Sequence, residues 1–162
     1  MSISGSELRS KQVRLGVVVY VDDYPEGRVV TLMFDDAAAK DWARCLNQLQ
    51  RRAVESLVLT SNSSAFRLRV QRDIRNVGAA RAWATWTKKE MSVRLTPMEL
   101  DYWAQFFTAY MERGQAPVDH IDVETTASTP SRRRSTTLVL KVPKADPSVP
   151  VEQTIRRLGT PP

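Results

Sequence analysis

Apolar and polar residues alternate along several stretches of the chain, and the first of these covers 13–21. A β-branched run over 28–34 predicts a second strand, and the intervening Asp-Asp-Tyr-Pro-Glu-Gly at 22–27 is typical of a turn. Because this connection is short, we expect the two strands to form a hairpin. The apolar positions that share one side of the first strand are Val13, Leu15, Val17, Val19 and Val21.

Two segments show helical spacing instead of alternation. The first begins with Asp35 and Asp36, an acidic pair typical of an N-cap and a first helical turn. Its apolar stripe consists of Trp42, Cys45, Leu46, Leu49 and Ala53. The second begins at Thr96-Pro97, has Glu99 in the position of a capping box, and ends at Gly114. Its apolar stripe consists of Leu100, Trp103, Phe106, Phe107, Tyr110 and Met111.

Shorter runs of alternating or β-branched residues predict more strands on either side of the second helix. They cover 57–59, 66–70, 81–87, 91–95 and 118–124. Strands that follow one another through short turns pair in antiparallel fashion. The pattern therefore predicts an α+β fold in which an antiparallel sheet carries two helices.

The two helical segments begin in similar sequence contexts. Trp42-Ala43 in the first corresponds to Trp103-Ala104 in the second, and the offset of 61 also relates the residues on either side. Any two junctions between a strand and a helix share some features, which is the alternative explanation. We favour a pseudo-duplicated β-β-α-β unit, present once over 13–60 and again over 66–124.

The α+β domain is expected to cover 13–124, after a flexible N-terminus at 1–12. From residue 125 onward Ser, Thr, Pro and Arg dominate, and such a tail over 125–162 is expected to be disordered on its own. A compact basic cluster in this tail suits phosphate groups or an acidic groove, although a solvated linker has the same composition. The cluster consists of Arg132, Arg133 and Arg134.

One apolar stretch interrupts the polar tail. Leu138, Leu140 and Val142 alternate with Val139 and Lys141, as in a strand. A lone strand on a polar tether is suited to extending the sheet of another chain. We therefore expect these three apolar side chains to dock onto a protein partner within a larger assembly.

The composition excludes several classes of protein. Hydrophobic residues make up 42% of the chain and charged residues 26%, as in ordinary globular domains. The single cysteine excludes an intramolecular disulfide, and together with one histidine it leaves no structural zinc set. No segment is apolar enough to span a membrane, and residues 1–12 lack the apolar core of a signal peptide. We expect a soluble intracellular protein without metal or cofactor.

Positive charge is concentrated in two parts of the chain. Residues 66–96 contain eight basic and two acidic residues, and residues 125–162 contain seven basic and two acidic ones. Residues 97–124 are acidic, with one basic and six acidic residues. The net charge of +6 therefore permits an anionic partner, and its distribution points to the strands between the two helices.

These strands are predicted to present a basic surface, because side chains alternate between the two faces of a strand. Arg67, Arg69 and Arg94 face away from the apolar positions of their strands, and Arg81 and Trp83 share one face of the strand between. Arginines neutralise phosphates and an aromatic ring stacks on a base, which is the chemistry that single-stranded nucleic acid requires. A solvated or protein-binding face has the same pattern.

Catalytic chemistry has little support in the sequence. His120 lies near Asp119 and Asp122 on a predicted strand, but no nucleophile motif accompanies them. Cys45 belongs to an apolar helix stripe, so it is expected to be buried. The glycine-rich phosphate-binding motifs, the nucleophile elbow and the zinc-protease motif are all missing from the sequence. We expect a non-enzymatic protein.

Three functions fit these observations. The first is an assembly or adaptor subunit that docks through its basic sheet face and its tail onto a larger complex, with or without nucleic acid. The second is a protein that binds single-stranded nucleic acid directly, and the third is an immunity protein that neutralises a toxin. The sequence does not identify the partner or the oligomeric state.

Overall fold

A computed structural model describes residues 9–25, 27–72, 82–86, 89–116, 118–127 and 135–143. For residues 82–86, 126, 127 and 135 it describes the backbone alone. The two helices are α2 (Asp36–Gln50) and α3 (Pro97–Arg113). The strands are β1 (Ser10–Leu15), β2 (Val17–Tyr24), β3 (Gly27–Phe34), β4 (Ser56–Ser61), β5 (Arg67–Arg72), β6 (Ala82–Trp86), β7 (Glu90–Leu95), β8 (His120–Ala127) and β9 (Ser135–Lys141).

The fold is α+β, as the sequence predicts, but the sheet is mixed. Within the described residues its strands follow the order β1-β4-β5-β7-β6-β8-β9-β3-β2. Antiparallel pairs form where a hairpin connects two strands, at β2–β3, β4–β5, β6–β7 and β8–β9. Strands from different hairpins meet in parallel, at β1–β4, β3–β9, β5–β7 and β6–β8. The predicted purely antiparallel sheet is therefore wrong, because a sequence pattern identifies local hairpins and not the long-range pairs between them.

Each half of the chain consists of a hairpin, a helix and a second hairpin. The long-range pairs of the two halves have matching registers, since Leu68 pairs with Met91 between β5 and β7, and Leu138 pairs with Val30 between β9 and β3. The duplication of an ancestral unit stays a prediction.

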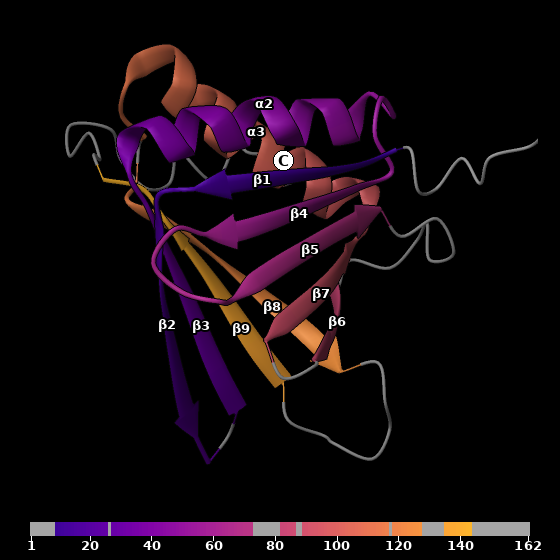
Figure 1. Ribbon diagram of the computed structural model, residues 1–162, viewed down its shortest axis with the longest axis vertical. Coiled ribbons are helices and arrows are strands. Elements are labelled where there is room, and N and C mark those ends of the chain that lie inside the picture. The colour runs from indigo at the N-terminus through magenta and orange to yellow at the C-terminus, as the bar shows by residue number, and fades with distance from the viewer. Residues whose placement is uncertain are drawn as a thin grey trace, which may run out of the picture.

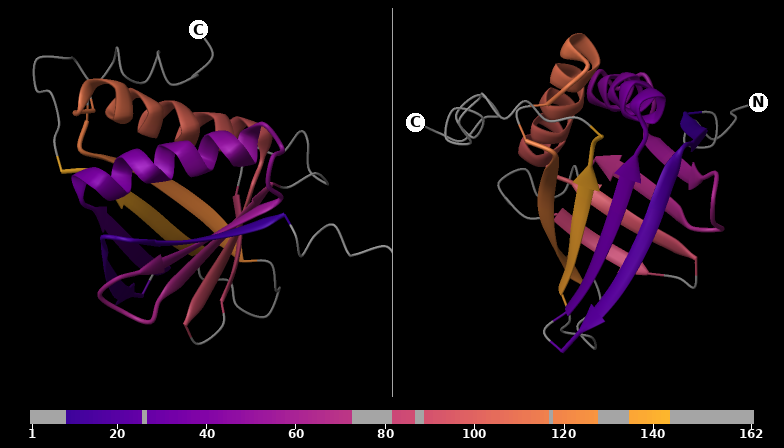
Figure 2. Two further views of the ribbon diagram at one scale, coloured as in Figure 1. Left: turned by 45° about the horizontal axis from the view of Figure 1, so that its top comes forward. Right: turned by 90° about the vertical axis from the view of Figure 1, so that its left-hand side faces the viewer.

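The sheet curls so that β2, β3, β9 and β8 form one wall and the remaining strands form the other (Figure 1). The helices α2 and α3 lie side by side across the top of both walls (Figure 2). Side chains on the inner face of the sheet pack against the helices in one core, which includes Trp42, Trp103 and Cys45. In this core the ring of Phe34 lies edge-on to Phe107, with centroids 5.1 Å apart. The burial predicted for both tryptophans and for Cys45 is confirmed.

The predicted helix boundaries are confirmed by their caps. The Asp35 carboxylate accepts a hydrogen bond from the backbone N–H of Ala38 at 2.7 Å, and the Thr96 hydroxyl accepts one from Glu99 at 3.2 Å. Gly114 ends α3 in the left-handed conformation, with φ 71°. Ala53, which the apolar stripe of the first helix included, lies beyond the end of α2 and is exposed.

The apolar stretch of the tail does not protrude from the domain. It forms β9, which lies between β8 and β3 inside the sheet of the same chain. Leu138, Leu140 and Val142 are 0%, 0% and 2% exposed, so they belong to the core and cannot dock onto a partner. The predicted domain end at 124 is also too early, because β9 fills the gap between two strands that would otherwise lack hydrogen-bond partners.

The domain also begins earlier than the sequence predicts. The predicted flexible segment at 1–12 overlaps β1, whose residues from Ser10 onward pair with β4. This parallel pairing joins segments about forty-six positions apart, between Ser10 and Ser56. The apolar alternation of the segment 13–21 does not reveal such a distant partner.

Gly16 is the corner at which the first predicted strand divides into β1 and β2. Before the corner the strand pairs with β4, and after it the strand pairs with β3, so one strand joins the two ends of the sheet. The backbone N–H of Asp35 donates to the Gly16 carbonyl at 2.9 Å. A Cβ atom at position 16 would lie only 1.8 Å from Oδ2 of Asp35. A side chain at this corner would therefore have to displace the Asp35 carboxylate.

The substitution Gly16→Ala tests this constraint. We expect it to lower the free energy of unfolding by roughly 2–3 kcal/mol, because the added methyl group displaces the capping carboxylate of Asp35. Chemical denaturation of the purified variant measures the loss. Gly114→Ala is the matched control, since a Cβ there meets nothing within 4 Å and costs only about 1–2 kcal/mol of left-handed backbone strain. Equal stability of Gly16→Ala and the wild type would show that the corner tolerates a side chain.

Candidate nucleic-acid interface

Three of the predicted basic residues come together on the outer face of β5 and β7. The parallel register pairs Arg67 with Glu90, Arg69 with Ser92 and Gln71 with Arg94. The intervening residues of both strands point inward and are buried, and they comprise Leu68, Val70, Met91, Val93 and Leu95. Alternation along each strand therefore places the three arginines on the side away from the core.

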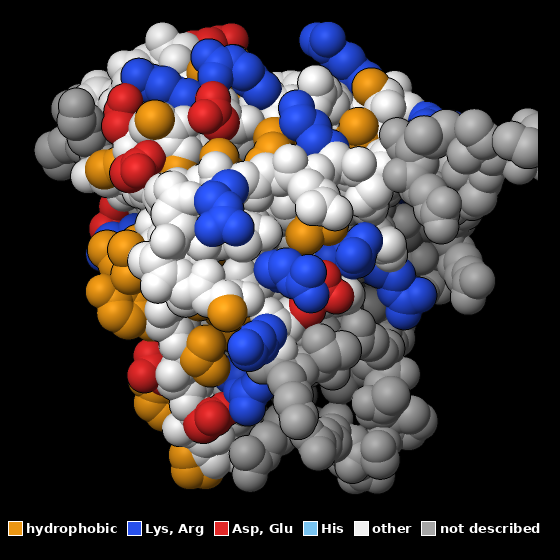
Figure 3. All heavy atoms as spheres, viewed as in Figure 1, with side chains coloured by type: hydrophobic (Ala, Val, Ile, Leu, Met, Phe, Trp, Pro, Cys, Tyr) orange, Lys and Arg blue, Asp and Glu red, His pale blue; other side chains and the backbone are white. Residues whose placement is uncertain are grey.

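A fourth arginine joins them from β1. Arg14 is exposed and pairs with Thr60 on β4, which in turn pairs with Arg67 on β5. We call Arg14, Arg67, Arg69 and Arg94 the basic face. Figure 3 shows the Lys and Arg side chains that gather over β1, β4, β5 and β7, with acidic side chains interspersed. The alternation of the first strand already placed Arg14 on the polar side, but only the structure brings β1 beside β4.

Glu90 moderates the charge of the basic face. Its Oε1 lies 3.9 Å from Nε of Arg67 and 3.6 Å from Nη2 of Arg69. The Glu90 side chain is only 17% exposed, whereas that of Arg67 is 54% exposed. One carboxylate thus partly offsets the charge of two guanidinium groups, which still reach solvent. The sequence gives no signal for this role of Glu90, which is one of two acidic residues in the basic segment 66–96.

The structure describes only the backbone of one other predicted binding residue, Trp83. The backbone of Trp83 on β6 pairs with that of Arg94 on β7. Arg81 lies outside the described residues, and so does the tail cluster Arg132, Arg133 and Arg134. These residues stay predictions, while the backbone register brings position 83 next to the basic face.

The outer face of the opposite wall has different chemistry. Val18 and Tyr20 on β2 and Met33 on β3 are 43%, 52% and 38% exposed, and we call these three residues the apolar patch. Val18 pairs directly with Met33. Hydrophobic side chains appear over β2 and β3 at the left of Figure 3. A contiguous exposed cluster of this kind is typical of a protein-binding surface, and the sequence analysis did not separate it from the core face of the strand.

His120 takes part in an exposed polar cluster at the start of β8. Its Nδ1 lies 2.6 Å from Oδ1 of Asp119, and its Nε2 lies 3.7 Å from Oδ1 of Asp122. The hydrogen bond with His120 is the main reason why the pKa of Asp119 is lowered. The cluster has no serine, threonine or cysteine among its partners in the described contacts, so it offers no activated nucleophile.

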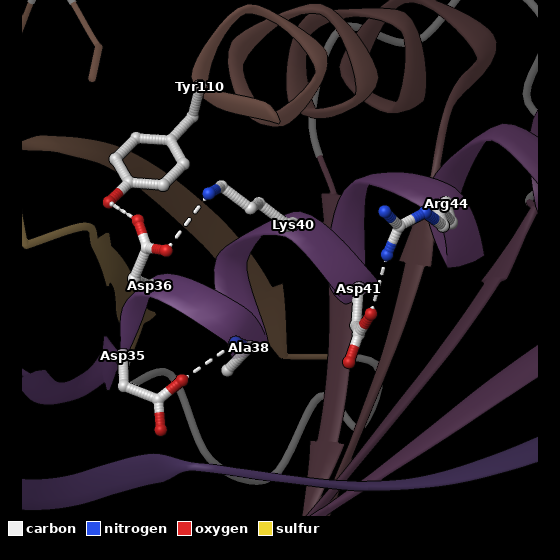
Figure 4. A network of polar contacts seen from close by, with 7 residues as sticks. All are labelled: Asp35, Asp36, Ala38, Lys40, Asp41, Arg44 and Tyr110. Atoms are coloured by element: carbon white, nitrogen blue, oxygen red, sulfur yellow. Dashed lines mark hydrogen bonds and ion pairs between the residues drawn. The ribbon is translucent and has the colours of Figure 1, made fainter. Parts of the chain in front are cut away.

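The acidic residues at the start of α2 have structural partners. Asp36 accepts a hydrogen bond from the Tyr110 hydroxyl at 2.8 Å and lies 3.0 Å from Nζ of Lys40 (Figure 4). Asp35 caps the helix in the same view.

Burial of Cys45 raises the pKa of its thiol, which makes it a poor nucleophile. No cluster of potential metal ligands occurs within the described part of the chain.

A shallow open hollow of about 350 Å³ lies between the two helices. It is lined by Asn47, Gln50, Ala104, Gln105, Thr108, Ala109 and Glu112. Asn47 donates a hydrogen bond to Thr108 across it at 3.1 Å, and these residues lie 61 positions apart. The hollow lacks the convergent ionisable groups of a catalytic site.

Comparison of the sequence with known proteins does not assign the chain to a family. The chain matches no protein-family model, and no curated protein shows significant similarity to it. Neither helix in the described ranges is long and apolar enough to cross a membrane. The function must therefore be inferred from the surface itself.

The Tyr110–Asp36 contact generates a prediction about alkaline pH. Burial first, and then the hydrogen bond and charge of Asp36, raise the pKa of Tyr110 to about 12. An unfolded tyrosine ionises near pH 10, so the contribution of Tyr110 to stability is fully present below about pH 10 and is lost as the pH rises towards about 12. The difference in phenolate absorbance between wild type and Tyr110→Phe isolates this ionisation.

Asp36→Asn separates the two causes of the shift. Without the carboxylate the pKa of Tyr110 should fall, but burial should keep it above that of an exposed tyrosine. A Tyr110 titration that is unchanged in Asp36→Asn would contradict the assigned hydrogen bond.

Proposed function

We propose that the protein is a non-enzymatic module that binds single-stranded nucleic acid on its basic face. The observation that carries this proposal is the convergence of four arginines from three strands on one outer surface, where Glu90 is the carboxylate that contacts any of them in the described ion pairs. Guanidinium groups bind phosphate oxygens through paired N–H donors, and they keep their charge at any physiological pH.

The arrangement suits a single strand that lies across the sheet. Arg67 and Arg69 lie two positions apart on β5, so their Cα atoms are separated by roughly 7 Å, and each guanidinium can meet a different phosphate. Arg94 on the adjacent strand widens the basic surface towards position 83, for which the sequence predicts a stacking tryptophan. The four arginines of the basic face lie on strands and none of them on a described helix, so the face itself offers no helix to the groove of a duplex.

Salt dependence provides a quantitative expectation. Each phosphate contact with a single strand contributes a slope of about −0.7 to the logarithm of the affinity against the logarithm of the salt concentration. Four contacts would produce a slope of about −3, and competition from Glu90 should keep the measured slope somewhat smaller.

Charge reversal at Arg69 tests the proposal. We expect Arg69→Glu to weaken binding of a fluorescent single-stranded oligonucleotide by roughly tenfold to a hundredfold, because it removes a charge-assisted contact and introduces repulsion. Fluorescence polarisation at several salt concentrations measures both the affinity and the slope. Arg113→Glu at the end of α3 is the matched control, since it makes the same change of net charge away from the basic face.

Glu90→Gln is the complementary variant. Glutamine has nearly the size of glutamate, so the substitution keeps the shape of the side chain on β7. It removes the only carboxylate that contacts Arg67 and Arg69 in the described ion pairs. We expect it to strengthen oligonucleotide binding severalfold and to steepen the salt dependence. Equal weakening by Arg69→Glu and Arg113→Glu, or no binding by the wild type at low salt, would disprove the proposal.

The adaptor function is the second candidate, and the apolar patch favours it. Val18, Tyr20 and Met33 lie on the wall opposite the basic face, so a protein partner and a nucleic acid need not compete for one surface. The strand β2 is also the last of the sheet, and an edge strand offers backbone groups for pairing with another chain. In this version the module would tether nucleic acid to a larger assembly.

Tyr20→Glu separates the two candidates. It places a charge within the apolar patch, so it should abolish capture of a protein partner while oligonucleotide binding stays within about twofold of the wild type. Quantitative affinity capture compares this variant with Arg69→Glu, which should show the reverse effects. Partner capture that depends on Arg69 and not on Tyr20 would assign docking to the basic face instead.

A further inference from the structure

A second group of arginines lies where the sheet meets the C-terminal end of α2. Arg9 immediately precedes β1, Arg52 follows α2, and Arg72 ends β5. Glu55, just before β4, is the carboxylate that acts on this group in the described contacts. We call Arg9, Arg52, Arg72 and Glu55 the rim cluster. Its residues come from three segments, which the pairing of β4 with β1 and with β5 brings together, so no local pattern indicated it.

Backbone and side-chain contacts hold the rim cluster in place. Nη1 of Arg9 lies 3.0 Å from Oε1 of Glu55, and the Glu55 backbone N–H donates to the Arg9 carbonyl at 2.8 Å. Nη2 of Arg9 also donates to the Arg52 carbonyl. Arg52 itself adopts a left-handed backbone conformation, with φ 64°, which ends the helix. The Arg9 guanidinium is thus held between the Glu55 carboxylate and the Arg52 carbonyl before any ligand binds.

Arg72 has an unmet hydrogen-bonding capacity. Its Nε is buried and has no hydrogen-bond partner among the described residues. Burial lowers the pKa of Arg72 most, and the positive charges of Arg52 and Arg9 lower it further, while Glu55 acts in the opposite direction. A buried donor without a partner and a repulsion between three guanidinium groups both favour an additional anion at this position.

We propose that the rim cluster binds a phosphate monoester, namely the terminal phosphate of a single-stranded nucleic acid. This inference rests on the proposed function of the basic face. Three guanidinium groups and one carboxylate leave two positive charges. A terminal monoester carries a charge of about −1.5 to −2, as phosphorylated side chains do, and so matches that excess better than an internal phosphodiester with one charge.

The rim cluster continues the basic face at one end. Arg72 directly follows Gln71, which pairs with Arg94 of the basic face. Along β5, Arg72 lies three positions beyond Arg69, a distance of roughly 10 Å. The side chain of Arg72 lies on the inner face of the sheet, because its partner Leu95 is buried in the core. A nucleic-acid strand that crosses the outer face would therefore have to bend over the edge of the sheet to place its end at the rim cluster.

The test compares three oligonucleotides of one sequence that carry a 5′-phosphate, a 3′-phosphate or no terminal phosphate. We expect one phosphorylated end to strengthen binding to the wild type roughly tenfold, as measured by fluorescence polarisation. Arg72→Gln should remove this preference and leave the affinity for the unphosphorylated strand within about twofold. Arg72→Lys keeps the charge but lacks Nε, so it should restore only part of the preference.

Glu55→Gln is a variant in which binding should increase, so it distinguishes loss of the phosphate site from poor folding. It removes the negative charge that competes with the phosphate, so the preference for the phosphorylated end should increase severalfold. A role of the rim cluster in folding alone would not produce such a gain. Arg113→Gln is the control for loss of one positive charge elsewhere on the surface.

The outcomes separate this inference from the proposed function. Binding of all three strands with equal affinity, sensitive to Arg69→Glu, would overturn the terminal-phosphate site and leave the basic face intact. Absence of binding to every strand would overturn both. Stabilisation of the wild type and not of Arg72→Gln by inorganic phosphate, without any preference for phosphorylated ends, would assign the rim cluster to free phosphate and overturn its role in nucleic-acid binding.

Discussion

The close approach of Gly16 and Asp35 is the constraint on which the rest of the structure depends. The Asp35 backbone donates to the Gly16 carbonyl, and its carboxylate caps α2 while occupying the space that a side chain at position 16 would need. One contact therefore sets the corner between β1 and β2 and the start of the helix. Because β1 and β2 stand at opposite ends of the strand order, the same corner brings the two walls of the sheet together.

Each wall of the sheet contains a parallel pair of strands from different hairpins, and the two walls have different outer surfaces. Arg69 lies on β5 in one wall and Val139 on β9 in the other, and each of these strands pairs in parallel with a strand from another hairpin. One wall thereby acquires the basic face, while the other carries the apolar patch. A charged surface and an apolar one on different walls allow two partners of different chemistry to bind without displacing each other.

The position of β9 changes where binding is to be sought. A strand with buried Leu138 and Leu140, hydrogen-bonded on both sides, is part of the folding unit, and its removal would expose β3 and β8. In the proposed function, recognition therefore takes place on surfaces that the folded sheet already orients, and not through a loose tail strand. The parallel register of β5 and β7 is an example, because it places Arg67 and Arg69 beside Glu90 on one outer surface.

The sequence by itself determined the features that depend on neighbours along the chain. Alternation and capping chemistry located both helices, the first hairpin, the buried tryptophans and the outward direction of Arg67, Arg69 and Arg94. Only the tertiary structure decided which hairpins lie side by side, and thus the mixed sheet, the insertion of β9, the addition of Arg14 and the assembly of the rim cluster. Pairing between remote strands depends on complementary shape and hydrogen bonding across the whole core, and no local pattern encodes these.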